Sequence, residues 1–142
     1  MTQITLELCE GLRNLTGAIP RTLPRRVLVV DDDKQDATIL KRALDDIGCS
    51  AEIATSGDMA IELVKSARPF TRIFLDLAFP VGRNGVETLS EVRQLAPLTP
   101  VTIVTGHFSE ELLSAAKALQ YDVIDKFVDT EKLKQAVVKA MG

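Results

Sequence analysis

Histidine and cysteine are nearly absent from this chain, and the shortage limits the kinds of site that it can build. The 142 residues include one histidine and two cysteines, Cys9 and Cys49, which lie far apart. That set excludes a zinc site of the usual Cys/His kind. It also argues against a disulfide framework, so we expect a reducing, cytoplasmic location.

Long hydrophobic runs are missing as well. No apolar stretch approaches the ~20 residues that a membrane-spanning helix requires, and the N-terminus lacks a basic leader followed by an apolar stretch. We therefore expect no membrane association and no signal peptide. The net charge of −3 gives no indication of direct nucleic-acid binding. With 46% hydrophobic and 26% charged residues, the composition is that of one ordinary globular domain.

From residue 26 onward, short apolar runs alternate with amphipathic stretches. Five runs are typical of strands: Val27–Val30, Ser50–Ala54, Thr71–Leu75, Val101–Val104 and Val123–Ile124. Apolar residues at helical spacing predict helix faces at Ile39, Leu40, Ala43, Leu44 and Ile47, at Met59, Ala60, Leu63 and Val64, at Val86, Leu89, Val92 and Leu95, and at Leu133, Val137 and Met141. A further helix should begin after Ser109. This alternation predicts an α/β fold, with a five-stranded parallel sheet and helices on both faces.

Residues 1–25 differ from the rest and are expected to form an N-terminal extension, a short helix followed by a linker, ahead of the domain at 26–142. Ile4, Leu8, Leu12 and Leu15 fit one face of a helix, although the first part of the segment also fits a strand. The extension is interpreted as packing on the domain. A docking or dimerisation role is the alternative.

Charged or hydroxyl residues follow four of the expected strands. Asp31-Asp32-Asp33 follows the first strand, Asp76 the third, Thr105 the fourth and Lys126 the fifth. Ligands of open parallel sheets bind outside the carboxyl ends of the strands, so these side chains should share one crevice. Each of them alone is compatible with a helix start or a solvated surface. The coincidence of all four strand ends favours a site.

The chemistry of this set suits a divalent cation and a phosphoryl group. Three carboxylates repel one another unless a cation compensates them, and Mg²⁺ takes oxygen ligands together with phosphate. A carboxylate can also attack phosphorus and form an acyl phosphate. Asp76 is the natural nucleophile because it stands alone at its strand end, while Lys126 and Thr105 could stabilise the phosphoryl oxygens.

The ordered motifs resemble the receiver domain of two-component response regulators, in particular the single-domain chemotaxis regulators. They are V-L-V-V-D-D-D at 27–33, F-L-D-L-A-F-P at 74–80, V-T-I-V-T-G at 101–106 and D-V-I-D-K at 122–126. The resemblance implies a flavodoxin-like doubly wound sheet with strand order 2-1-3-4-5. It also implies a phosphoprotein of phosphorelay signal transduction that is not a conventional enzyme, although it can dephosphorylate itself.

The resemblance assigns a role to each site residue. Asp76 would be the phosphoacceptor and a metal ligand, Lys126 the phosphate-binding lysine, and Thr105 the hydroxyl that responds to phosphorylation. Asp31 and Asp32 would hold Mg²⁺, with Asp32 the more direct ligand.

The backbone carbonyl of Ala78 would complete the metal ligands. Two further residues, His107 and Val123, should tune the site. The alternative for His107 is that it is an exposed loop residue.

Three departures from the family pattern stand out. Phe127 follows the lysine where the family usually has proline, and Val123 stands where the family often has Tyr or Phe. The loop between Pro80 and Gly85 is one residue longer than usual. We therefore expect an atypical response to phosphorylation, without movement of an aromatic ring.

The implied function is Mg²⁺-dependent acceptance of a phosphoryl group on Asp76 from a histidine kinase or phosphotransfer protein, followed by altered contacts with a downstream protein target. A homodimer, and the choice between a stand-alone regulator and one domain of a longer protein, stay open. The main alternative is a receiver-like interaction module that is not phosphorylated. An aspartate-based phosphatase is disfavoured because Ala78 stands where a second acid is expected, and a flavin or dinucleotide carrier lacks a glycine-rich phosphate loop.

Overall fold

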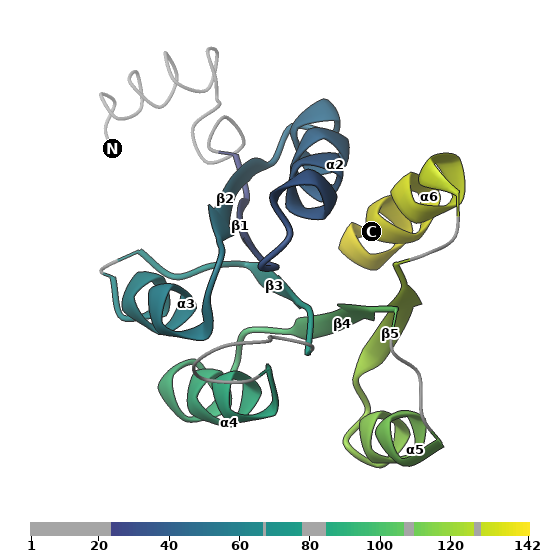
Figure 1. Ribbon diagram of the computed structural model, residues 1–142. Coiled ribbons are helices and arrows are strands. Elements are labelled where there is room, and N and C mark those ends of the chain that lie inside the picture. Colours follow the sequence, from purple (N-terminus) through teal and green to yellow (C-terminus); the bar gives the residue numbers. More distant parts are fainter. Residues whose placement is uncertain (1–23, 67, 78–84, 107–109, 127–128) are drawn as a thin grey trace, which may run out of the picture.

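Figure 1 shows the chain as a central sheet flanked by helices in a computed structural model. The structure describes residues 24–66, 68–77, 85–106, 110–126 and 129–142. Almost all of the expected extension at 1–25 therefore lies outside the described residues. The division into an extension and a domain stays a prediction.

Strands and helices alternate along the whole described part. They are β1 (Arg26–Val30), α2 (Lys34–Asp46), β2 (Ser50–Ala54), α3 (Gly57–Val64), β3 (Arg72–Leu75), α4 (Gly85–Leu95), β4 (Val101–Thr105), α5 (Glu110–Ala118), β5 (Asp122–Asp125) and α6 (Thr130–Met141). All five expected strands are present, with ends that differ from the sequence-based bounds by no more than one residue. Ser109, the expected start of the fourth helix, lies outside the described residues.

The strands form one parallel sheet in the order β2-β1-β3-β4-β5. Helices α2 and α6 cover one face of the sheet, and α3 and α4 lie on the other (Figure 1). Helix α5 packs near the edge strand β5. The predicted fold class and strand order are confirmed.

Two apolar clusters hold the helices against the sheet, one on each face. Strand β1 contributes to both, because Val27 and Val29 face α2 and α6, while Leu28 and Val30 face α3 and α4. All four of these side chains are almost completely buried. Burial on both faces is the reason why the central strands are continuous apolar runs.

Some of the residues expected in the core are on the surface. Met59 in α3 is 43% exposed, and Ile61 is buried in its place. In α4, Val86 is 62% exposed because Gly85, Thr88 and Val92 form the buried face. The middle position of that face is Thr88, which is completely buried. Because threonine is not apolar, a pattern of apolar residues alone predicts the wrong buried face for this helix.

Candidate phosphoryl and metal site

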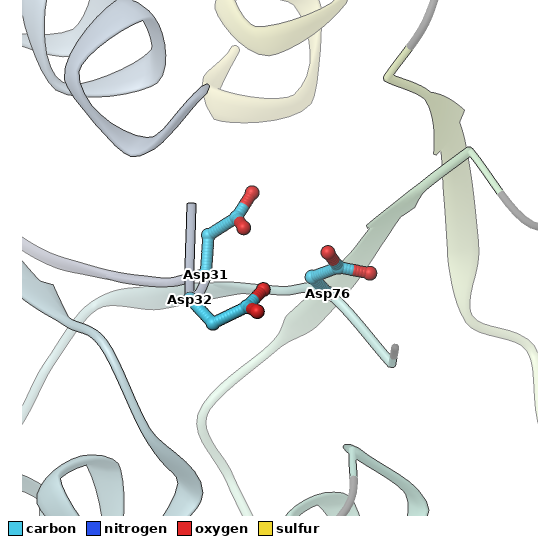
Figure 2. Close-up of side chains that lie close together, drawn as sticks. All are labelled: Asp31, Asp32 and Asp76. Atoms are coloured by element: carbon cyan, nitrogen blue, oxygen red, sulfur yellow. The ribbon is translucent and has the colours of Figure 1, made fainter. Parts of the chain in front are cut away.

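The parallel hydrogen-bond ladder continues one residue beyond the strands and fixes the backbone of the acidic site. The N–H of Asp31 donates to the Ala54 carbonyl at 3.0 Å, and the N–H of Asp76 donates to the Val30 carbonyl at 3.0 Å. Asp31 and Asp76 therefore leave neighbouring strands side by side. Figure 2 shows their side chains, with that of Asp32, gathered at the ends of β1 and β3.

The triple-acid run divides into a helix cap and two site residues. The Asp33 carboxylate caps α2, because it accepts hydrogen bonds from the N–H groups of Gln35 at 2.9 Å and Asp36 at 3.1 Å. Asp31 is buried at the base of the site, and one of its oxygens accepts from the Asp33 N–H at 2.9 Å. Asp32 is exposed at the mouth. The helix-start interpretation thus holds for Asp33.

Lys126, which directly follows the edge strand β5, bonds to the two buried carboxylates. Its Nζ lies 2.7 Å from an oxygen of Asp76 and 2.9 Å from an oxygen of Asp31. The lysine side chain is only 8% exposed, so little water screens these pairs. Its backbone N–H donates to the Thr105 carbonyl at 3.1 Å, which ties the lysine to the end of β4.

The same Nζ lies 3.1 Å from a carboxylate oxygen of Asp36, a residue that the sequence analysis did not identify. Asp36 lies in the first turn of α2. An acid in that position is ordinary helix chemistry, since it interacts favourably with the helix dipole. No signal in the sequence therefore separated it from a surface residue, and only the packing of α2 brings it to Lys126.

Burial dominates the electrostatics of the site. It raises the pKa of the Asp31 carboxyl to about 6, against the lowering effect of the hydrogen bonds from Lys126 and the Asp33 N–H. Burial alone would lower the pKa of the Lys126 ammonium, but its hydrogen bonds to Asp76 and Asp31 outweigh burial and raise the pKa above its ordinary value. Lys126 therefore stays charged at neutral pH.

The acidic residues fit a divalent cation. One carboxylate oxygen from each of Asp31, Asp32 and Asp76 can be chosen so that all three lie within 4.8 Å of one another. Carboxylate oxygens are the hard ligands that Mg²⁺ prefers, and this ion commonly keeps several waters beside one or two carboxylates and a phosphate. The exposed position of Asp32 leaves the group open to solvent on one side.

The remaining predicted site residues are placed in part. Thr105 is completely buried at the end of β4, and Val123 lies half-buried in β5 beside Ile103. Ala78, His107 and Phe127 lie outside the described residues, as does the loop that ends before Gly85. The roles predicted for the carbonyl of Ala78 and for the His107 side chain stay predictions.

Comparison with known proteins places the chain in a family. Residues 27–138 match the sequence profile of the response regulator receiver domain. The chain belongs to this family. Its receiver fold is the one that two-component response regulators use, as the ordered motifs predicted.

Curated relatives include longer regulators. The transcriptional regulatory protein ZraR of Escherichia coli O157:H7 is 34% identical over 117 residues, which cover 82% of this chain and 26% of ZraR. The nitrogen assimilation regulatory protein NtrX of Azorhizobium caulinodans is 31% identical over 117 residues, covering 81% of this chain and 26% of NtrX. The receiver chain thus spans about a quarter of the length of these regulators.

Solved receiver domains share the fold over nearly their whole length. The Vibrio cholerae chemotaxis protein CheY4 superposes with a TM-score of 0.69 at 28% identity, covering 82% of this chain and 98% of CheY4. A CheY-like receiver domain protein from Methanospirillum hungatei JF-1 gives 0.70 at 25% identity, covering 83% and 94%. Within the described ranges of this receiver, no helix is both long and apolar enough to span a membrane.

Proposed function

We propose that this receiver domain accepts a phosphoryl group on Asp76 in the presence of Mg²⁺, from a phosphohistidine on a histidine kinase or phosphotransfer protein. The observation that carries the proposal is the short contact between Lys126 and the buried Asp76, with two further carboxylates beside it. A lysine held at this distance can compensate the charge of an incoming phosphoryl group. A downstream protein would then recognise the phosphorylated form.

The chemical step is a substitution at phosphorus. A carboxylate oxygen of Asp76 attacks the phosphorus and forms an O–P bond, while the P–N bond to the donor histidine breaks. The bonding electron pair stays with the imidazole nitrogen, which then takes up a proton. Lys126 stabilises the charge on the phosphoryl oxygens, and the hydroxyl of Thr105 can donate to one of them.

Asp31 and Asp32 would hold the metal ion together with Asp76 and the Ala78 carbonyl. When bound, Mg²⁺ supplies positive charge that offsets the carboxylates and the phosphoryl oxygens. Asp31 is fixed for this task by its hydrogen bond from the Asp33 N–H. Asp32 is the accessible ligand through which the ion would enter.

The test is phosphorylation by a small acyl phosphate followed by intact mass measurement. The wild-type chain should gain the mass of one phosphoryl group with Mg²⁺ and none with a chelator. Asp76→Asn keeps the side-chain shape but is not a nucleophile, so it should gain nothing while its circular dichroism spectrum stays that of the wild type. Undiminished labelling of Asp76→Asn would refute the assignment.

A matched control separates loss of the acceptor from general damage. Asp33→Asn retains a capping side chain and the backbone N–H that orients Asp31, so its labelling should stay close to wild type. If the wild-type chain itself takes no phosphoryl group at any Mg²⁺ concentration, the interaction module without phosphorylation becomes the better account.

A further inference from the structure

An apolar groove opens at the end of the molecule opposite the acidic site. It has a volume of about 420 Å³ and lies between the C-terminal ends of α3 and α4, beside the start of β3. The apolar side chains that line it include Val64, Pro69, Phe70, Leu95, Pro97 and Leu98. The acidic site lies at the carboxyl ends of the strands, so the two features share no residue.

Two leucines at the rim of this groove have exposed side chains in the described part of the chain. Leu98 is 94% exposed and Leu95 is 44% exposed. One exposed leucine is common on protein surfaces, but two at the rim of a single apolar groove form a patch that favours a contact.

The N-terminal segment leaves the described part of the chain next to this groove. Two residues after Pro24, the guanidinium of Arg26 lies 4.0 Å from the centre of the Phe70 ring and donates to the Ser66 hydroxyl at 3.3 Å. Phe70 and Ser66 both line the groove. The side chain of Arg26 is therefore held at the groove by direct contacts, whereas that of the preceding Arg25 donates to the Met141 carbonyl of α6 at 2.9 Å.

The preceding residues carry a matching apolar pattern. Ile4, Leu8, Leu12 and Leu15 recur at the three- and four-residue spacing of one helix face. Residues 16–23 connect this pattern to Pro24, and eight residues can span up to about 25 Å. The connection is thus long enough to return the apolar residues to the groove that Arg26 contacts.

We infer that the N-terminal segment covers the groove between α3 and α4, with Leu8 and Leu12 against Leu95 and Leu98. A covalently joined segment binds intramolecularly, at an effective concentration that reaches the order of mM for short linkers. A second copy of the chain would have to compete with it from solution. The inference does not depend on phosphorylation, because the acidic site stays open at the other end of the sheet.

Cys9 allows a direct test on the full chain, because it neighbours Leu8. Cys49→Ala removes the buried second thiol, which is 6% exposed. Leu98→Cys in that background should form an intramolecular disulfide with Cys9 under mild oxidation, identified by peptide mass mapping. The matched control is Val86→Cys in the same background, since Val86 is 62% exposed and lies at the other end of α4. The Leu98→Cys chain should close at least about tenfold faster.

Equal rates for the two thiols, or a covalent dimer as the main product, would overturn the inference; the dimer would assign the groove to a second copy. Thermal unfolding gives an independent measurement. Leu98→Asp and Leu12→Asp should each lower the melting temperature of the full chain, and the double variant should fall no further than the lower single variant. An unchanged melting temperature for Leu98→Asp would show that the groove is uncovered.

Discussion

Lys126 is the residue on which the charge balance of the acidic site depends. Its ammonium lies within 3.1 Å of carboxylate oxygens from Asp31, Asp36 and Asp76. Asp31 and Asp76 are almost completely buried, so neither can turn to water if the cation is removed. Breaking one side of a buried ion pair is costly because it leaves uncompensated charge in a poorly solvated place.

Lys126→Ala should therefore destabilise the metal-free protein by about 3 kcal/mol or more. It should also tighten Mg²⁺ binding, because the ion and the lysine compensate the same carboxylates, while phosphorylation falls. Urea unfolding with a chelator and calorimetric titration with Mg²⁺ measure the two effects. The control is Lys41→Ala, which removes an exposed pair to Asp45 at 3.0 Å and should cost less than about 0.5 kcal/mol. A small loss for Lys126→Ala, similar to that of the control, would contradict the argument.

Asp31 should make the metal-free protein sensitive to pH. Its pKa rises from 3.8 to about 6 in the folded chain, so the folded state binds the proton more tightly than the unfolded state. The resulting stabilisation is complete below about pH 3.8 and disappears as the pH rises through about 6. Its full size is about 3 kcal/mol.

Asp31→Asn cannot titrate and provides the reference. In a chelator, the free energy of unfolding of the wild type should fall relative to that of Asp31→Asn between about pH 4 and pH 6. Urea unfolding at a series of pH values measures the difference. A difference between the two proteins that is independent of pH would show that Asp31 does not carry the shifted pKa.

Among the secondary-structure elements, α4 approaches the site through a glycine. Gly85 is the buried first residue of α4, and a Cβ atom there would overlap the backbone of Leu77. Leu77 follows Asp76 directly, so this close approach fixes the chain next to the proposed phosphoacceptor. The absent side chain at Gly85 is thus a steric requirement for the position of α4.

Gly85→Ala should force α4 and the Leu77 backbone apart. We expect a loss of about 1–3 kcal/mol in the free energy of unfolding, as for overpacked cores, together with slower phosphorylation at Asp76. Gly142→Ala is the control, because its nearest heavy atom would be 3.5 Å away, an ordinary contact. Denaturant unfolding and labelling rates decide the outcome. Wild-type values for Gly85→Ala would mean that the helix can shift without consequence.

The strands of this fold were more predictable from the sequence than the buried faces of its helices. Strands were predictable because β1 and its neighbours bury both faces, which leaves a continuous apolar run. The meeting of Asp31, Asp76 and Lys126 was predictable because parallel strands end at one edge. Helix faces were less certain. The buried Thr88 and the exposed Val86 in α4 follow from how the helix packs on the sheet.

The contact of Asp36 with Lys126 was not predictable either, because it also depends on how a helix packs on the sheet. A carboxylate in the first turn of a helix has a sufficient local explanation, so the sequence gives no cause to look further. Only the packing of α2 on the sheet brings Asp36 within 3.1 Å of the lysine.

At the scale of the whole molecule, β4 and β5 connect the acidic site to one side of the receiver. Thr105 ends β4 in complete burial, and its carbonyl accepts the N–H of Lys126. Beyond them α5 packs near β5, with Ala116 buried against the domain. Val123 is half-buried, at the position where the resemblance to the family often implies an aromatic side chain. A valine has few rotamers and no ring to move between buried and exposed positions.

We therefore expect phosphorylation to act through backbone displacement from Thr105 to α5. A shift of the Thr105 hydroxyl toward a phosphoryl oxygen would move the adjacent Gly106, whose backbone adapts more freely than that of other residues. Coupling free energies of about 1–3 kcal/mol are sufficient to change partner affinity several-fold or more.

Hydrogen exchange with beryllofluoride and Mg²⁺ should change in α5 and β5 and stay constant in β2 at the opposite edge of the sheet. Asp76→Asn under the same conditions is the control and should show no change. Exchange that alters only at Asp31, Asp32, Asp76 and Lys126 would show that the signal ends at the site, and the route through α5 would then be wrong.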